Sequence, residues 1–377
     1  MRNNLNLYIA LLLITALIFF SLTIFAFGHT ESQKISLSAS SAVLYQPETQ
    51  NFLYAKNPNQ RLPMASTTKI MTALVALEQT SLTDRVMINE SSVGVEGSSA
   101  YLKAGEELTM EELLYALLLQ SANDAATAIA CYIGGDVERF ACLMNDKAAS
   151  LGLNDTHFMN PHGLDNEKHY TTASDLAIIA AEAMKNETFK TIASTYKKSF
   201  STDERSRTYV NHNKLLRMYD GCVGVKTGFT KKSGRCLVAA AERDGLTFIS
   251  VTLDAPSDWN DHKKMLDYGF DSLEKINLAD AEEYCYKIPL LGGESDQVTV
   301  ANPIGSSVIL PKGRSEFGQK IKLVRYAIAP VNEGEILGEV VFTVDGQEVS
   351  RVNLVAKETI LKKKEKGLLD KLFSLFN

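Results

Sequence analysis

The stretch 64-MASTTKIMTALVAL-77 predicts a helix that is apolar on nearly every face, and such a helix belongs inside a domain. It places Ser66 and Lys69 three residues apart, so both side chains lie on one helical face with Cβ atoms about 5–6 Å apart. A serine at the start of a helix lies near its free N–H groups and its positive dipole end. The apolar surroundings of Lys69 disfavour its charged form. A neutral amine beside a hydroxyl is a base beside a nucleophile, so this stretch predicts a nucleophilic serine.

Length and composition limit the class of protein. The chain has 377 residues and 45% hydrophobic residues, which favours two domains with tails and a packed core. Its formal net charge is -6, and no basic stripe interrupts its acidic body, which argues against nucleic-acid binding. Residues 357–377 are rich in lysine and carry a net positive charge, which suggests an anionic surface such as a membrane.

An uncharged apolar segment, residues 7–27, follows Arg2 near the N-terminus. Ala26 and Gly28 fit the small-residue positions of a cleavage site, so residues 1–28 read as a secretory signal peptide. The segment is also long enough to span a bilayer uncleaved, as a signal anchor. In both cases we expect the remaining chain to be exported and to work at the extracytoplasmic face of the cell membrane.

The cysteine pattern indicates neither a metal site nor a disulfide framework. An odd number of cysteines in an exported protein leaves at least one thiol unpaired, and none of the spacings has the C-x-x-C form of a zinc site. Cys222 and Cys236 flank an expected hairpin and are candidates for a disulfide bridge. The preferred alternative is that all are small, buried, unpaired residues. They are Cys131, Cys142, Cys222, Cys236 and Cys285.

The periodicity of apolar residues divides the chain into two expected domains. In residues 33–275, strands near both ends enclose a mostly helical middle, which predicts an α+β fold with one antiparallel sheet covered by helices. Residues 277–357 read as strands and turns alone, a small all-β domain that serves as a spacer or docking module. The strands expected in the first domain are residues 42–45, 52–55, 223–227, 236–241 and 247–253.

The last segment, residues 362–377, is rich in lysine and then amphipathic. Its leucine and phenylalanine side chains fall on one helical face, which fits a helix lying in a membrane interface. A helix this short anchors weakly by itself. The alternative is a frayed terminal helix or one packed against a partner.

Two tripeptides strengthen the prediction made from Ser66 and Lys69. Ser121-Ala122-Asn123 interrupts two expected helices, and Lys226-Thr227-Gly228 lies on an expected strand that leads into a turn. An S-x-x-K element followed by S-x-N and K-T-G elements marks the class A β-lactamases and the penicillin-binding proteins.

On these motifs the chain resembles the low-molecular-mass D-alanyl-D-alanine carboxypeptidases, penicillin-binding serine peptidases of the β-lactamase/transpeptidase-like superfamily. The resemblance covers roughly residues 35–360 and includes residues 160–165 (NPHGLD) and 211–216 (NHNKLL). It implies an enzyme of peptidoglycan maturation that removes the terminal D-alanine from pentapeptide stems. It also implies that the enzyme needs no metal or other cofactor and is inhibited by β-lactam antibiotics.

The resemblance further implies catalytic roles for the first two motifs. Ser66 attacks the carbonyl between the last two D-alanines and forms an acyl-enzyme, while Lys69 accepts its proton. For this the pKa of Lys69 must fall, to which burial and the charge of Lys226 contribute. Ser121 relays the proton to the leaving amine, and Asn123 holds the substrate amide or the lysine in place.

The third motif is expected to bind the substrate. Lys226 and Thr227 bind the terminal carboxylate, and Gly228, which has no Cβ, lets the substrate backbone approach the strand. The N–H groups of Ser66 and Phe229 form an oxyanion hole. Phe229 stands where some relatives have histidine, which leaves only its N–H a role. His212 has two readings, a contact in the carboxylate pocket or a structural loop residue.

Two alternatives remain on the sequence alone. A β-lactamase is one, but no Glu-x-x-Leu-Asn element that would place a deacylating water lies between Ser121 and Lys226. We therefore expect slow release of penicillin.

The second alternative is an inactive peptidoglycan-binding scaffold, although none of the three motifs is damaged. Trp259 is expected to cap a core.

Overall fold

The computed structural model describes residues 35–201 and 206–364. The expected signal peptide or anchor (1–28) and all but the first residues of the expected amphipathic tail (362–377) lie outside the described residues. Within the described ranges, no helix combines the length and apolar character needed to cross a bilayer.

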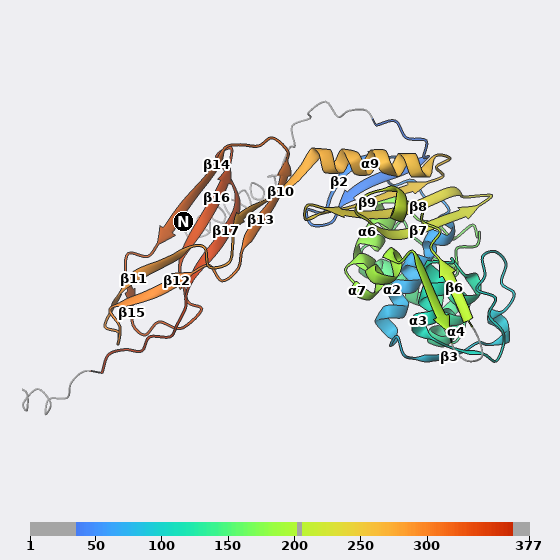
Figure 1. Ribbon diagram of the computed structural model, residues 1–377, viewed down its shortest axis with the longest axis horizontal. Coiled ribbons are helices and arrows are strands. Elements are labelled where there is room, and N and C mark those ends of the chain that lie inside the picture. Colours follow the sequence, from blue (N-terminus) through green and yellow to red (C-terminus); the bar gives the residue numbers. More distant parts are fainter. Residues whose placement is uncertain (1–34, 202–205, 365–377) are drawn as a thin grey trace, which may run out of the picture. The chain divides into compact units, whose positions relative to one another are not determined.

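A five-stranded antiparallel sheet, in the order β2-β1-β9-β8-β7, organises the first domain (Figure 1). β1 pairs with β9 from Ser41 opposite Leu253 to Tyr45 opposite Ile249, so the sheet is assembled from distant parts of the chain. The α+β fold expected from the sequence is thereby confirmed. The strands are β1 (Ser41–Gln46), β2 (Asn51–Lys56), β7 (Cys222–Thr230), β8 (Gly234–Arg243) and β9 (Leu246–Leu253).

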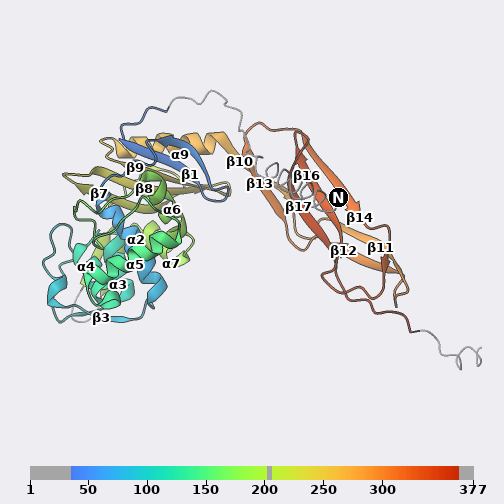
Figure 2. The same cartoon turned by 180° about the vertical axis from the view of Figure 1, so that it is seen from behind.

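Helices cover both faces of this sheet. α9 (Asp258–Ser272) packs on β9 and β8, and Figures 1 and 2 show α2, α6 and α7 on the other side. Successive residues of β8 serve the two faces in turn, because Val238 belongs to the large core under the helices and Leu237 to a small cluster near α9. The helices of the large core are α2 (Lys69–Gln79), α3 (Met110–Leu118), α4 (Asn123–Gly134), α5 (Val137–Ser150), α6 (Ala173–Met184) and α7 (Glu187–Ser194).

The helix that the sequence predicts from residue 64 begins differently. Its first turn is a 3₁₀ turn, η1 (Ala65–Thr68), and α2 follows from Lys69. The hydroxyl of Thr67 donates to the carbonyl of Met64 at 2.6 Å, and the hydroxyl of Thr68 donates to the carbonyl of Ala65 at 2.8 Å. Side-chain bonds of this kind compete with regular helical bonds, so the nucleophile motif sits in a tighter turn than expected.

Short elements complete the first domain. A capping box joins Thr109 and Glu112 at the start of α3, where the sequence has the corresponding spacing. The β5–β6 hairpin was not expected, because its strands are short and mostly polar. These elements are β3 (Arg85–Met87), η2 (Glu90–Ser92), β4 (Glu107–Thr109), β5 (Lys197–Ser201), β6 (Ser206–Val210) and α8 (Leu215–Met218).

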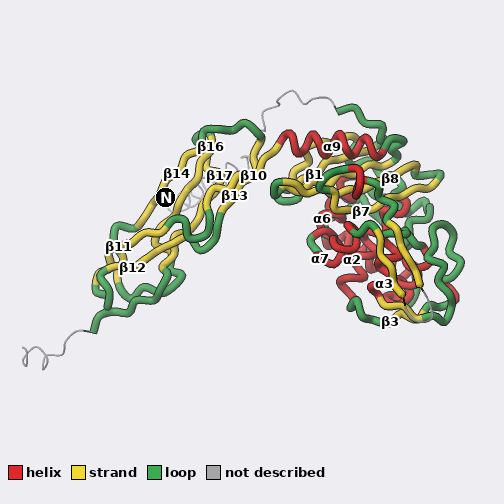
Figure 3. Tube along the Cα trace, viewed as in Figure 1, coloured by secondary structure: helices red, strands yellow, loops and turns green. Residues whose placement is uncertain are grey.

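The second domain contains strands and loops only among its described residues, as Figure 3 shows. β10 (Leu273–Ala279) pairs with β13 (Ser306–Pro311), so the expected boundary between residues 275 and 277 falls inside β10. Within this domain the sequence also predicts a strand over residues 323–326, but only Leu323 lies in one. The remaining strands form one sheet of order β14-β16-β17-β12-β11-β15. They are β11 (Cys285–Leu291), β12 (Gln297–Ala301), β14 (Phe317–Leu323), β15 (Ala327–Ile328), β16 (Ile336–Val344) and β17 (Gln347–Ala356).

All five cysteines lie in the described residues and are free thiols. Cys236 is buried as expected, whereas Cys142 and Cys285 are exposed, so the expectation of burial is wrong for these two. Cys285 begins strand β11 and Cys142 lies on the outer side of α5, where the surrounding residues are polar.

Candidate active site

Lys69 occupies the centre of a group of three oxygen atoms. Its Nζ lies 3.0 Å from the hydroxyl of Ser66, 2.6 Å from Oδ1 of Asn123 and 2.6 Å from the backbone carbonyl oxygen of His162. The two carbonyl oxygens can only accept hydrogen bonds, whereas the serine hydroxyl can also donate. A neutral amine has two N–H groups and one lone pair. A neutral amine can therefore satisfy all three contacts. It donates a hydrogen bond to each carbonyl oxygen and accepts one from the Ser66 hydroxyl.

The surroundings of Lys69 favour that neutral form. The side chain is completely buried, and burial lowers its pKa well below the usual value for a lysine. The nearby charge of Lys226 lowers the pKa further, while the carboxylate of Asp124 acts in the opposite direction. Lys69 is thus prepared to act as a base next to the Ser66 hydroxyl.

The Ser121-Ala122-Asn123 motif bridges the end of α3 and the start of α4. Ser121 has a left-handed backbone (φ 60°), as does Ala65 (φ 46°) just before the nucleophile. Non-glycine residues in this region are strained by about 1–3 kcal/mol, which surrounding contacts must offset. The amide of Asn123 is fixed, because its nitrogen donates to the carbonyl of Glu96 while its oxygen accepts from Lys69.

Lys226, Thr227 and Gly228 lie on β7, the edge strand that faces η1. Lys226 is buried, burial lowers its pKa to about 7, and its Nζ donates to the Thr227 carbonyl at 3.0 Å. A Cβ on Gly228 would lie 3.0 Å from the backbone nitrogen of Ser66. The structure thus gives Gly228 a role that the sequence reading missed, since it allows the strand to approach the turn that carries the nucleophile.

A cavity of about 360 Å³ joins these elements. Ser66, Ser121, Thr227, Gly228, Phe229 and His212 line it, so it brings together most residues predicted from the sequence. Lys69, Asn123 and Lys226 are buried behind its wall. Five further lining residues were not predicted, because a single residue outside a motif carries no sequence pattern that marks it as part of a site. Trp259, which was expected to cap a core, is among them. These are Ser98, Lys214, Arg235, Asp258 and Trp259.

His212 lines the cavity from the loop before α8 and is exposed. Partial burial lowers its pKa, and the charge of Lys226 lowers it further. Both facts place His212 next to the strand that carries Thr227. Within the described ranges, no group of three His, Cys, Asp or Glu residues is arranged to hold a metal ion.

The loop of residues 160–165 packs against η1, the turn that carries Ser66. Besides the His162 carbonyl that Lys69 contacts, the Pro161 carbonyl accepts a hydrogen bond from Thr72 at 2.6 Å. Gly163 has φ 89°, and a Cβ there would lie 1.9 Å from the carbonyl oxygen of Ala65. Only glycine fits this contact, so loop and turn are packed backbone to backbone.

The same turn is held on its buried side by His169. Nδ1 of this residue accepts from the Met159 N–H at 3.0 Å, which leaves the proton on Nε2, 2.7 Å from the Thr68 hydroxyl. Thr68 in turn donates to Ala65. Burial lowers the pKa of His169 to about 4, so the ring stays neutral in this chain of hydrogen bonds.

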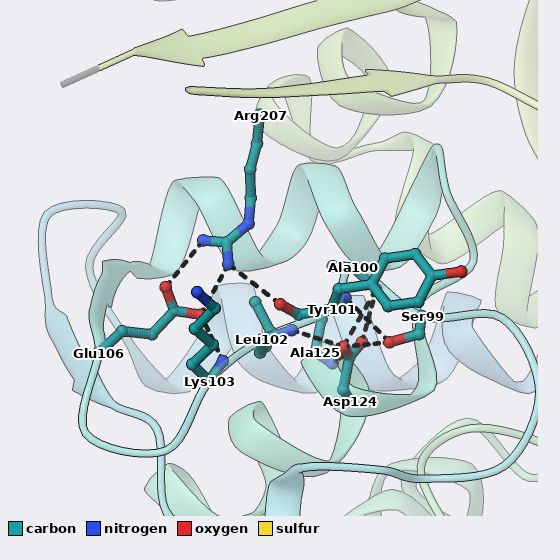
Figure 4. A network of polar contacts seen from close by, with 9 residues as sticks. All are labelled: Ser99, Ala100, Tyr101, Leu102, Lys103, Glu106, Asp124, Ala125 and Arg207. Atoms are coloured by element: carbon teal, nitrogen blue, oxygen red, sulfur yellow. Dashed lines mark hydrogen bonds and ion pairs between the residues drawn. The ribbon is translucent and has the colours of Figure 1, made fainter. Parts of the chain in front are cut away.

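The cavity wall that contains Ser98 belongs to a loop fastened at two points (Figure 4). At the first point, the buried carboxylate of Asp124 accepts from the hydroxyl of Ser99 and the N–H groups of Ala100 and Leu102. At the second, Arg207 of β6 pairs with Glu106 at 2.8 Å, and both side chains are 17% exposed. The unexpected β5–β6 hairpin therefore braces the loop beside the Ser121 motif.

Comparisons with known proteins agree over nearly the whole described chain. The family model for D-alanyl-D-alanine carboxypeptidases matches residues 28–257, and that for the C-terminal domain of penicillin-binding protein 5 matches residues 273–362. D-alanyl-D-alanine carboxypeptidase DacF of Bacillus subtilis is 35% identical over 344 residues, covering 88% of both chains. The crystal structure of penicillin-binding protein 5 from Haemophilus influenzae is 30% identical and superposes with a TM-score of 0.65, covering 87% of this chain and 99% of the other. The Streptomyces K15 DD-transpeptidase is 37% identical, with a TM-score of 0.60, over 63% of this chain and 98% of its own.

Proposed function

Because this chain belongs to the D-alanyl-D-alanine carboxypeptidase family of serine peptidases, family S11, we propose how its own residues carry out the reaction. Its activity is the hydrolysis of a D-alanyl-D-alanine bond, and the substrates that the family implies are peptidoglycan stem peptides. The roles of individual residues below are our proposal.

In the first half of the reaction, Ser66 Oγ attacks the carbonyl carbon of the penultimate D-alanine. Lys69 Nζ, 3.0 Å away, takes the hydroxyl proton as the new C–O bond forms. The contacts of Lys69 to Asn123 and His162 hold the amine in this orientation throughout. The backbone N–H groups of Ser66 and Phe229 receive the negative charge that develops on the carbonyl oxygen.

The C–N bond to the terminal D-alanine then breaks. Ser121, which lines the same cavity, passes the proton from Lys69 to the nitrogen of the leaving group. D-alanine therefore departs with a neutral amine, and the acyl group stays on Ser66. A water molecule hydrolyses this ester by the reverse sequence, with Lys69 again accepting the proton. No step needs a metal or redox cofactor, since the acid–base groups and the nucleophile are all in the chain.

Substrate binding uses the edge of the sheet. Thr227 and Lys226 bind the terminal carboxylate, with His212 at the same end of the cavity. The same arrangement accepts a β-lactam, whose strained amide acylates Ser66, and we propose that this acyl-enzyme is released slowly.

The single observation that supports this mechanism best is the placement of Lys69 Nζ between two carbonyl oxygens and the Ser66 hydroxyl. Release of D-alanine from an N-acetylated pentapeptide stem, measured for the wild-type chain and for Ser66→Ala, tests it. We expect release only by the wild type, and only the wild type should retain a labelled penicillin. Labelling of Ser66→Ala at another residue would contradict the assignment of the nucleophile.

We also propose that the enzyme acts at the outer face of the cell membrane, with the second domain as a spacer. The apolar segment 7–27 and the amphipathic segment 362–377 support this proposal by their composition. Cell fractionation of the full chain, and of a chain that stops before residue 362, tests it. Recovery of both in the cytosolic fraction would refute the proposal.

A further inference from the structure

The cavity wall beyond Phe229 carries a charged group that the mechanism so far does not use. Arg235 of β8 lines the cavity together with Asp258 and Trp259, which begin α9. None of the three belongs to the sequence motifs. Each lies on the side of the cavity where the carboxylate of the substrate is expected.

Arg235 is held in place by both of its neighbours. Its Nη2 lies 2.9 Å from Oδ2 of Asp258, whose side chain is only 3% exposed, and its guanidinium carbon lies 5.6 Å from the centre of the Trp259 ring. A guanidinium has five N–H donors in a fixed plane, so one contact to Asp258 leaves others for a ligand. The Arg235 side chain is 43% exposed, and it lines the cavity. It is therefore oriented on one side and accessible on the other.

The register of the sheet brings Arg235 near Thr227. Phe229 pairs with Arg235 and Thr227 with Leu237, so Arg235 is the diagonal neighbour of Thr227 on the same face of the β7–β8 pair. Such diagonal neighbours have Cα atoms about 7–8 Å apart, within reach of a long side chain. A carboxylate bound to the Thr227 hydroxyl would lie between the two.

Lys226, the cation that the motif supplies, is poorly suited to hold that carboxylate alone. Its side chain is 1% exposed, and its Nζ already donates to the Thr227 carbonyl. Burial lowers its pKa to about 7, so near neutral pH it is charged only part of the time. An arginine stays charged throughout this range. Arg235 thus adds a permanently charged cation to this wall.

We propose that Arg235, oriented by Asp258 and Trp259, binds the terminal carboxylate of the substrate together with Thr227. Two parallel N–H···O bonds to a carboxylate give direction as well as energy. Arg235 thereby selects peptides that end in a free carboxylate, which favours carboxypeptidase over endopeptidase action. This inference rests on the proposed function, because it concerns the same cavity and the same substrate end.

The test compares one peptide in two forms, diacetyl-L-Lys-D-Ala-D-Ala and its C-terminal amide. In the full-length wild-type enzyme we expect a strong preference for the acid. Arg235→Gln should lower kcat/KM for the acid roughly 10–100-fold, mainly through KM, and leave the amide unchanged. Arg235→Lys, which keeps the charge without the planar fork, should recover part of the loss. An equal loss for acid and amide would overturn the proposal, since it would indicate a structural role.

Arg243 offers a matched control at the other end of β8. It also pairs with an aspartate, Asp267, and stacks on the Tyr219 and Phe270 rings, but it does not line the cavity. Arg243→Gln should leave the acid-to-amide preference as in the wild type. A loss of preference equal to that of Arg235→Gln would contradict the proposal.

Penicillin provides a second readout that separates this inference from the proposed function. Benzylpenicillin carries a carboxylate that mimics the substrate terminus, and its methyl ester does not. Arg235→Gln should slow acylation of Ser66 by the acid and not by the ester. If the wild type released no D-alanine but showed this difference, the carboxypeptidase mechanism would fail and the role of Arg235 would stand. Equal slowing of acid and ester would refute that role.

Discussion

Replacing Asn123 with aspartate changes one atom and reverses the electrostatics of the proposed base. Oδ1 of Asn123 lies 2.6 Å from Lys69 Nζ, so the new carboxylate would be in direct contact with the amine. Two unit charges 4 Å apart interact by about 4 kcal/mol at an effective dielectric constant of about 20, and here the distance is shorter. Part of this energy is lost to desolvation of the carboxylate. We take about 3 kcal/mol as the net stabilisation of the charged lysine.

The sign of the effect follows from which form is favoured. A carboxylate stabilises the ammonium form, so the pKa of Lys69 rises and less of the amine is neutral at neutral pH. At pH values below the pKa of Lys69 in both proteins, acylation should fall on the order of 100-fold, since 1.36 kcal/mol corresponds to a factor of ten. The rate should recover as the pH rises, because the proton is then removed from Lys69. The pH profile of Asn123→Asp is therefore expected to move to alkaline values.

The assay is the second-order rate constant for acylation by a fluorescent penicillin, measured between pH 5 and 10. Asn123→Ala is the matched control, because it removes the same contact without adding a charge. It should lower the rate at all pH values and leave the profile in place. An unshifted profile for Asn123→Asp, with the protein folded, would refute a catalytic role for neutral Lys69.

Two further predictions concern the framework of the site. Gly163→Ala would bring a Cβ to 1.9 Å from the Ala65 carbonyl oxygen, and we expect a loss of about 3 kcal/mol or more in unfolding free energy together with loss of penicillin labelling. Gly152→Ala, at φ 75° with nothing within 4 Å of the new Cβ, should cost only about 1–2 kcal/mol, and equal melting temperatures for the two variants would argue against the packing described. Burial lowers the pKa of His169 to about 4 and that of His262 to about 3, whereas both side chains titrate at about 6.5 in the unfolded chain. The unfolded chain therefore binds protons first, and stability present at pH 7 should fall by about 3 kcal/mol per histidine between pH 6.5 and 4. Urea unfolding of wild type and His262→Gln at both pH values checks this, and the same pH dependence for both proteins would speak against it.

The sequence predicted one antiparallel sheet built from strands near both ends of the first domain, because these strands are continuous apolar runs. Val238 and its neighbours in β8 are buried on both faces, and such runs are recognised without knowledge of the partner strand. The polar strands of β5 and β6 carry no such signal. Their position depends on the ion pair between Arg207 and Glu106, which the chain brings together only when folded.

The motif residues were predictable for a different reason. Ser66, Ser121 and Lys226 stand in short patterns tied to a known chemistry, and all three meet around one cavity. Arg235 and Trp259 stand in no pattern, and only the register of β8 and the start of α9 bring them to the same wall. Left-handed backbone at a non-glycine residue such as Ser121 is equally invisible in a sequence, since tertiary contacts impose it.

The protonation state of Lys69 can be measured directly by following its Cε resonance in a chain labelled with ¹³C-lysine and assigned with Lys69→Arg. Burial beside Lys226 lowers the pKa of Lys69, so we predict an uncharged resonance at the pH where acylation of Ser66 is fastest. A Lys69 signal that titrates together with the exposed lysines, at a pKa of about 10.4, would contradict the role of Lys69 as a neutral base.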